Sequence, residues 1–205
     1  MLGLPKATEL HKSLPKKAIY AKFQMNTAAK EKIDADISRI AIVNEISPEK
    51  VHIAAGEKVK LFFVVQVALK KKDFDERAIV TLSKLIPQNM LFVLECGKET
   101  KLAIYHTKLM QTLWYEKGSI SLVLKGLTLD TVWENIIVQV GGVQIESGNT
   151  LDEQIEIDGR RQRLEKEIDR LDKQARKEKQ PKKRVELVQR GNKLKKELRE
   201  LPSAT

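Results

Sequence analysis

The sequence has 205 residues, with 38 Lys and Arg against 28 Asp and Glu, so its formal net charge is +10. A hydrophobic fraction of 41% and a charged fraction of 32% predict one ordinary folded core joined to a very polar segment. One cysteine and three histidines exclude an intrachain disulfide and the usual Cys₄ and Cys₂His₂ zinc sites. The N-terminus lacks a secretory signal pattern, and apolar runs such as Leu61–Val65 are too short to span a membrane. We therefore expect a cytoplasmic protein without membrane contact.

Residues 1–147 are expected to form an α+β body, a mixed β-sheet flanked by helices. Two Leu-Pro-Lys units near the N-terminus favour extended or turn backbone. Helical apolar spacing predicts helices at 28–36, capped by Thr27, at 73–85, and from a cap at Thr128 or Asp130 to 140. Alternating or continuous apolar runs predict strands at 38–46, 51–58, 61–69, 90–96, 101–108, 113–118 and 119–126. Because these strands are grouped, they favour α+β over a doubly wound sheet.

Residues 148–205 are expected to form a basic helical hairpin, a short antiparallel coiled coil. Of the 55 residues in 151–205, 17 are basic, 12 are acidic and none is aromatic. Pro181 interrupts two stretches of helical spacing, so we expect one helix to end before it and another to begin there. A single long helix kinked at Pro181 is the alternative. The apolar seam of the two helices is predicted at Ile157, Leu164, Ile168, Leu171 and Ala175, and at Leu187, Gly191, Leu194, Leu198 and Leu201.

No catalytic motif is recognisable, so we assign no catalytic residue, metal site or cofactor. The phosphate-binding patterns G-x-x-x-x-G-K-[ST] and G-x-G-x-x-G are missing from the sequence. One alternative is a Mg²⁺-dependent nuclease, because carboxylates bind Mg²⁺ and a lysine can organise the attacking water. Its residues would be Glu99 and Lys101, with a further acid from Asp73, Asp75 or Glu95.

The basic residues give the clearest functional indication. Cations on one side of the first hairpin helix, at the hairpin tip and near the N-terminus predict contact with the nucleic-acid backbone that is non-specific and sensitive to salt. The alternatives are a solubilising coiled-coil surface, or a hairpin that oligomerises or binds a protein. The predicted contact residues are Lys16, Lys17, Arg163, Lys166, Arg170, Lys173, Lys177, Lys182, Lys183 and Arg184.

Five segments carry a family resemblance: LPKATELHKSLPKKAIY, ISPEKVHIAAGEKV, LIPQNMLFVLE, LVLKGLTLDTVWENIIVQV and RRQRLEKEIDRLDKQARKEKQ. In this order, over nearly the whole chain, they resemble the bacterial and archaeal family of domain of unknown function 4391. The resemblance implies a companion of superfamily-2 helicases and DNA methyltransferases in restriction-like antiphage defence. It also implies an acidic residue in the central strand, where this chain has Gln66.

We therefore expect a non-catalytic accessory subunit of a DNA-acting defence complex, in which the body docks on a helicase or methyltransferase. A nuclease subunit and a purely structural assembly module are the alternatives.

Overall fold

The computed structural model describes residues 2–201, which divide after Gly142 into two compact units. We call Met1–Gly142 the α+β unit and Val143–Thr205 the hairpin unit. The predicted boundary between body and hairpin was at 147/148, five residues further along the chain. Among residues 2–201, no helix combines the length and the apolar character that a membrane span requires.

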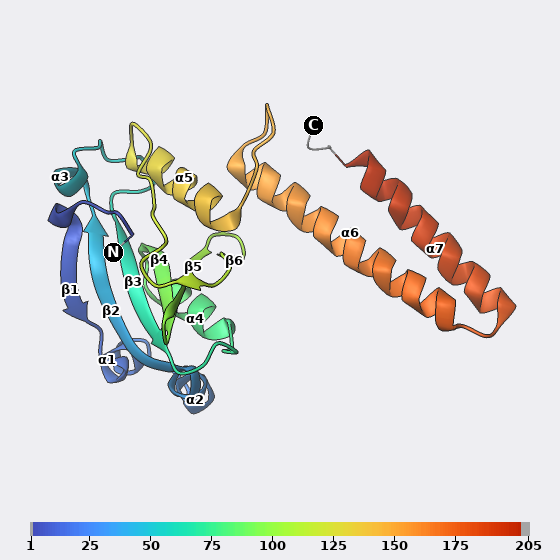
Figure 1. Ribbon diagram of the computed structural model, residues 1–205, viewed down its shortest axis with the longest axis horizontal. Coiled ribbons are helices and arrows are strands. Elements are labelled where there is room, and N and C mark those ends of the chain that lie inside the picture. Colours follow the sequence, from blue (N-terminus) through green and yellow to red (C-terminus); the bar gives the residue numbers. More distant parts are fainter. Residues whose placement is uncertain (1, 202–205) are drawn as a thin grey trace. The chain divides into compact units, whose positions relative to one another are not determined.

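A mixed sheet forms the centre of the α+β unit (Figure 1). All neighbouring strands are antiparallel except β3 and β4, which are parallel and are joined through helix α4. The prediction of an α+β fold with a mixed sheet is thus confirmed. In spatial order the strands are β1 (Glu9–Ser13), β2 (Ile37–Ile46), β3 (Phe62–Leu69), β4 (Asn89–Cys96), β5 (Glu99–Tyr105) and β6 (Leu109–Gln111), with β7 (Tyr115–Glu116) also paired to β5.

Helices cover both faces of this sheet. Alternate residues of β3, including Val65 and Val67, share one apolar core with residues from α1, α2 and α4. On the opposite face Phe62 packs against Trp133 of α5, with ring centroids 5.0 Å apart. Figure 1 shows α1 and α2 near one end of the strands and α3 and α5 near the other. The helical elements are η1 (Lys6–Thr8), α1 (Lys16–Lys22), α2 (Thr27–Asp36), α3 (Pro48–Val51), α4 (Arg77–Leu85) and α5 (Leu129–Gly141).

The N-terminal segment is more ordered than the sequence predicted. It forms edge strand β1 and helix α1. Apart from Leu10 the side chains of β1 are exposed, so no apolar alternation marks this strand in the sequence. The second Leu-Pro-Lys unit is the start of α1, because Pro15 occupies the N-cap and Lys16 the first helical position.

The strand predicted at 51–58 is wrong. Helix α3 ends at Val51, and the chain then forms a loop held by Asp130 of α5, which is 71–73 residues away in the sequence. The Asp130 carboxylate accepts hydrogen bonds from the backbone N–H groups of Val59 (2.7 Å), Lys58 (3.2 Å) and Glu57 (2.7 Å). These bonds, that of Val59 above all, hold the pKa of Asp130 below its usual value. A side chain at Gly56 would collide with this carboxylate.

The strand predicted at 119–126 is also wrong. The backbone of this segment makes hydrogen bonds with side chains of α5 and not with a neighbouring strand. The Gln139 amide accepts a hydrogen bond from the N–H of Val123 at 3.0 Å and donates one to the carbonyl of Val123 at 2.9 Å. Asn135 donates to the carbonyl of Lys125 at 3.0 Å. Side-chain amides therefore satisfy backbone groups that a neighbouring strand would otherwise satisfy. The strand predicted at 113–118 is reduced to the two residues of β7.

Two predicted helix starts are shifted. Asn26, not Thr27, caps α2, because its side-chain oxygen accepts a hydrogen bond from the Ala29 N–H at 2.8 Å. The helix predicted from Asp73 begins at Arg77. The preceding loop is held by the buried carboxylate of Asp36, which accepts the Asp75 N–H at 2.7 Å and pairs with Lys71 at 3.1 Å.

Asp36 makes the stability of the α+β unit dependent on pH. The N–H of Asp75, followed by Lys71, lowers the pKa of this carboxyl, so its contribution is present above about pH 4 and is lost as the pH falls through the lowered pKa. We expect Asp36→Asn to reduce the free energy of unfolding at pH 7 by about 1–2 kcal/mol. Urea unfolding should show the two proteins converging below pH 4. If the two proteins differed in their free energy of unfolding by the same amount at pH 7 and below pH 4, this role would be contradicted.

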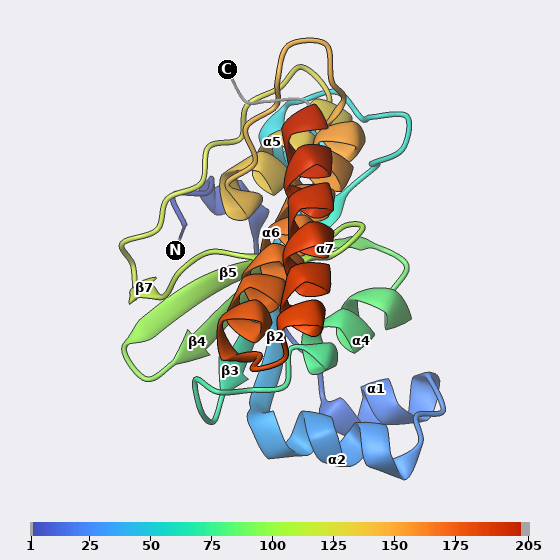
Figure 2. The ribbon, with the colours of Figure 1, turned by 90° about the vertical axis from the view of Figure 1, so that its right-hand side faces the viewer.

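The hairpin unit contains two helices, α6 (Leu151–Lys177) and α7 (Pro181–Glu200), which lie side by side (Figure 2). The predicted C-terminal hairpin is confirmed. The alternative of one helix kinked at Pro181 is wrong, because the chain reverses between α6 and α7. Pro181 is the first residue of α7. The N–H of a first helical residue has no partner within the helix, so a proline at this position costs no hydrogen bond.

Candidate nucleic-acid interface

An apolar seam joins α6 to α7. Leu164, Ile168, Leu171 and Ala175 of α6 are buried as predicted. On α7 only Gly191 is buried, and Leu187, Leu194 and Leu198 are half-buried. A Cβ at Gly191 would meet Asp172 Oδ1 at 3.5 Å, an ordinary van der Waals contact.

Ion pairs between the helices fix their register. Arg160 pairs with Glu197 at 2.6 Å, and Lys195 pairs with Asp172 at 2.9 Å. The start of α6 is fixed by a capping box in which Thr150 Oγ1 accepts the Glu153 N–H and the Glu153 carboxylate accepts the Thr150 N–H. The Thr150 N–H, followed by its hydroxyl, lowers the pKa of Glu153.

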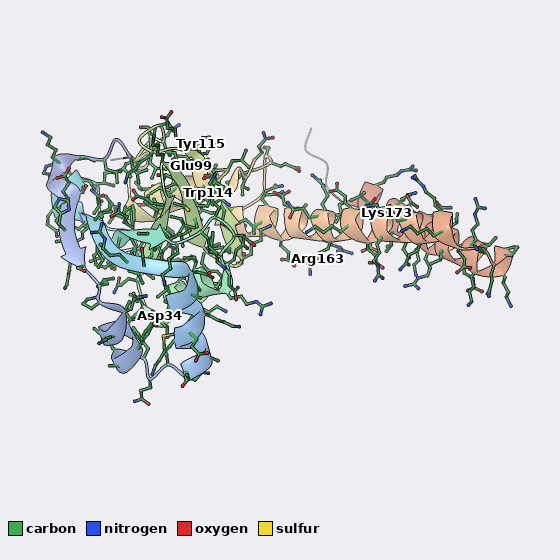
Figure 3. The ribbon with its side chains drawn as sticks, turned by 60° about the horizontal axis from the view of Figure 1, so that its bottom comes forward. Asp34, Glu99, Trp114, Tyr115, Arg163 and Lys173 are labelled. Carbon is green, nitrogen blue, oxygen red and sulfur yellow. The ribbon has the colours of Figure 1, made fainter. Side chains whose placement is uncertain are left out.

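The predicted cationic side of α6 is exposed, but part of its charge is neutralised. Arg170 pairs with Glu167 and Lys173 with Asp169, both at 2.6 Å, and Arg163 donates to the Gly159 carbonyl at 3.1 Å. Figure 3 shows Arg163 and Lys173 on this helix. Over its length α6 has eight basic and eight acidic residues, and so no net charge. The five cations predicted on this side of α6 are Arg163, Lys166, Arg170, Lys173 and Lys177. Because acidic residues neutralise part of their charge, this side is a weaker anion-binding surface than the cations alone predicted.

The positive charge of the hairpin lies instead on α7 and at the turn. Helix α7 has eight basic residues against three acidic ones, a net charge of +5. We define the hairpin tip as residues 177–184. Its five cations are exposed, and in residues 2–201 no ion pair is found for any of them. The only acid of the tip, Glu178, accepts the backbone N–H of Gln180 at 2.8 Å. The cations of the hairpin tip are Lys177, Lys179, Lys182, Lys183 and Arg184.

The first turn of α7 adds to this positive potential. It contains three cations and no acidic residue. The N-terminus of a helix carries a partial positive charge, so cations there oppose the helix dipole, each by about 0.3–1 kcal/mol. A groove of about 550 Å³ between the ends of the two helices has the cations Lys177, Lys183 and Arg190 in its wall, together with the acids Glu178 and Glu186. The predicted contact residues did not include Lys179 of the turn or Arg190 of α7, although a charge count for each helix would have indicated Arg190.

The two predicted N-terminal contacts differ from each other. Lys16 is half-buried, pairs with Asp34 at 2.5 Å and donates to the Ile37 carbonyl at 2.8 Å. Lys16 is the main cause of the lowered pKa of Asp34. Asp34 also accepts the Tyr20 hydroxyl at 2.8 Å, and burial raises the pKa of Tyr20. Lys16 therefore joins α1 to α2 and β2, whereas Lys17 is exposed.

Residues of the nuclease alternative are engaged by other side chains. Glu99 pairs with Lys72, and Glu95 pairs with Lys117 at 2.9 Å. Lys101 lies over the Trp114 ring, with Nζ 5.2 Å from the ring centroid. Figure 3 shows Glu99 and Trp114 in the same part of the α+β unit.

Asp73 is exposed, and Asp75 is half-buried in the loop before α4. Gln66 is buried in β3, between Ala41 of β2 and Val93 of β4. Within residues 2–201, no three His, Cys, Asp or Glu side chains lie close enough together to hold a metal ion. The arrangement therefore gives the nuclease alternative no support.

The chain matches a protein-family model. The model of the family described as domain of unknown function (DUF4391) matches residues 2–198, which cover both structural units. No curated protein and no solved structure matches the chain. The family match agrees with the resemblance noted in the five sequence segments. The chain therefore belongs to the DUF4391 family.

Proposed function

We propose that this protein binds the nucleic-acid backbone without sequence preference, through the hairpin tip and the neighbouring cations of α7. The observation that carries the proposal is the group of five exposed cations at residues 177–184, with one acidic residue already engaged by the backbone. Lysine and arginine attract phosphate but do not read sequence unless they reach base edges. An exposed turn between two helices is suited to contact with the phosphates of a nucleic acid.

The unfavourable charge in the first turn of α7 supports the same function. Lys182, Lys183 and Arg184 oppose the helix dipole, so they destabilise the free hairpin. An anionic ligand would reverse this effect, because it neutralises the cations and lies at the positive end of the helix. A surface that only kept the hairpin in solution would not require cations at this position.

Titration of a fluorescent random-sequence duplex tests the proposal. We expect the anisotropy of the duplex to rise on binding, and the logarithm of affinity to fall linearly with the logarithm of salt. If three to five tip cations each neutralise a phosphate, the slope is about −3 to −5. Undetectable binding at 50 mM salt, or an affinity independent of salt, would contradict the proposal.

The wider role that we propose is that of a non-catalytic accessory subunit of a DNA-acting, restriction-like defence complex. The α+β unit would dock on a helicase or DNA methyltransferase, and the hairpin would contact the DNA that this partner acts on. The family resemblance supports this role, and the division of the chain into two units is compatible with two separate contacts. Co-purification from the native locus tests it, and recovery of the protein without a DNA-acting partner would contradict it.

A second candidate function is self-assembly through the hairpin. It is favoured by the open apolar side of α7, where Val185 and Val188 are 54% and 43% exposed. Light scattering of the full chain separates the two functions. If the protein has the mass of a single chain and also binds duplex, assembly is excluded as its main role.

A further inference from the structure

Two hollows in the α+β unit share a wall formed by Ile86 and Met90. The first, of about 210 Å³, lies between α1 and the sheet and is lined by apolar groups that include Ala18 and Phe63. The second, of about 640 Å³, lies where β3 and β4 begin, next to the end of α4. Because they share a wall, a single extended ligand can occupy both.

The first hollow, which we call the apolar pocket, is suited to one side chain. Typical small-molecule pockets enclose roughly 300–1,000 Å³, so the apolar pocket is too small for most metabolites. The one charged residue in its lining is Lys22, whose ammonium lies over the Phe23 ring, 5.4 Å from the ring centroid. A large aliphatic or aromatic side chain would fill the pocket without leaving a polar group unsatisfied.

The second hollow, which we call the basic groove, is lined by Lys58, Lys60 and Lys84. All residues lining the two hollows belong to the described part of the chain, and none of them is acidic. The charge of Lys58 is partly offset by Asp130, to which its backbone donates. Lys60 donates to the Gly56 carbonyl at 2.8 Å, and Lys84 lies over the Tyr105 ring at 5.2 Å. Neither of these two contacts neutralises a charge, so Lys60 and Lys84 keep the groove positive.

We propose that the apolar pocket and the basic groove together bind an acidic peptide segment of a partner protein, with one large apolar side chain in the pocket and carboxylates over Lys60 and Lys84. Charge complementarity requires an acidic occupant, and the pocket requires that it also carry an apolar group. A nucleic-acid backbone has the charge but nothing that fills the pocket. The inference rests on the part of the proposed function in which the α+β unit docks on a partner, and it is independent of the hairpin.

A random 12-residue peptide library panned on the immobilised full chain tests this inference. We expect enriched sequences to combine Asp or Glu with one Leu, Ile, Met, Phe or Trp. The binding constant of a fluorescein-labelled enriched peptide is then measured by anisotropy. Ala18→Phe, at an exposed position in the pocket lining, places a ring in the pocket and should weaken binding about tenfold or more. Ala21→Phe, on the same helix and outside the pocket lining, is the matched control.

A charge variant tests the groove separately. Lys60→Glu with Lys84→Glu should weaken peptide binding about tenfold and reduce its salt dependence, whereas Lys98→Glu with Lys125→Glu should change neither. The inference is overturned if panning enriches no acidic, apolar sequence, if Ala18→Phe binds as the wild type does, or if random duplex displaces the peptide. Lys182→Gln with Lys183→Gln and Arg184→Gln should leave peptide binding unchanged, so that failure here is distinguishable from failure of the DNA proposal.

Discussion

Replacing Lys182, Lys183 and Arg184 with glutamine is expected to remove most of the salt dependence of duplex binding. These three side chains are exposed, and within residues 2–201 none has a carboxylate partner. Each phosphate contact contributes about −0.9 to the slope of log affinity against log salt, so three lost contacts reduce the slope by about 2.7. The ratio of affinities at 50 and 200 mM salt should then shrink roughly fortyfold. Anisotropy titrations of wild type and variant at four salt concentrations measure the effect.

The matched control removes charge from the side of α6. Arg170 and Lys173 are exposed, as the tip cations are, but each has a carboxylate partner on its own helix at 2.6 Å. Changing both to glutamine also releases Glu167 and Asp169, so the slope should change by less than one unit. Equal effects of the two variants would contradict the assignment of the contact to the tip, because they would show that this side of α6 contributes as much as the tip does.

Leu171→Ala is expected to unfold the hairpin. Leu171 is 1% exposed at the centre of the seam, and truncating a buried leucine to alanine costs about 2–5 kcal/mol. A unit of about 60 residues has little stability to lose, so most of the helix signal of α6 and α7 should disappear and duplex binding with it. Circular dichroism at 222 nm, followed through thermal unfolding, measures the loss.

Val188→Ala is the control for this effect. Val188 lies on the partner helix and is 43% exposed, so its truncation should change stability by less than about 0.5 kcal/mol. An unchanged transition in Leu171→Ala would mean that the seam does not hold the two helices together.

The hairpin was predictable because its local signals agree with its tertiary packing. The 4,3 spacing of Leu164, Ile168, Leu171 and Ala175 identifies the buried side of α6, and Pro181 marks the start of α7. The central strands were predictable for a similar reason. Runs such as 61–69 are almost entirely apolar, as a strand covered on both faces requires. In these segments the sequence pattern and the packing give the same result.

The segments that were wrongly predicted are held by side chains distant in sequence. The loop at 56–59 depends on Asp130, and the extended chain at 119–126 depends on Gln139 and Asn135. No local pattern reveals that a carboxylate or an amide will satisfy these backbone groups. Edge strand β1 was missed because its exposed side chains show no apolar alternation.

The candidate site was predictable in part. The apolar spacing shows which side of each helix faces the seam, so the cations on the opposite sides could be predicted to be exposed. The pairing of Arg170 and Lys173 depends on side-chain conformation, and the burial of Lys16 beside Asp34 depends on how α1 packs. The neutral charge of α6 and the +5 charge of α7 were available from the sequence, once each helix is counted by itself.

Lysine footprinting tests the central claim most directly. The full chain is acetylated with and without random-sequence duplex at 50 mM salt, and the modified lysines are quantified by mass spectrometry. We predict that duplex protects Lys177, Lys179, Lys182 and Lys183, while Lys98 and Lys125 of the α+β unit react at the same rate in both samples. Protection confined to lysines of the α+β unit, or equal modification of the tip lysines with and without duplex, would contradict the account.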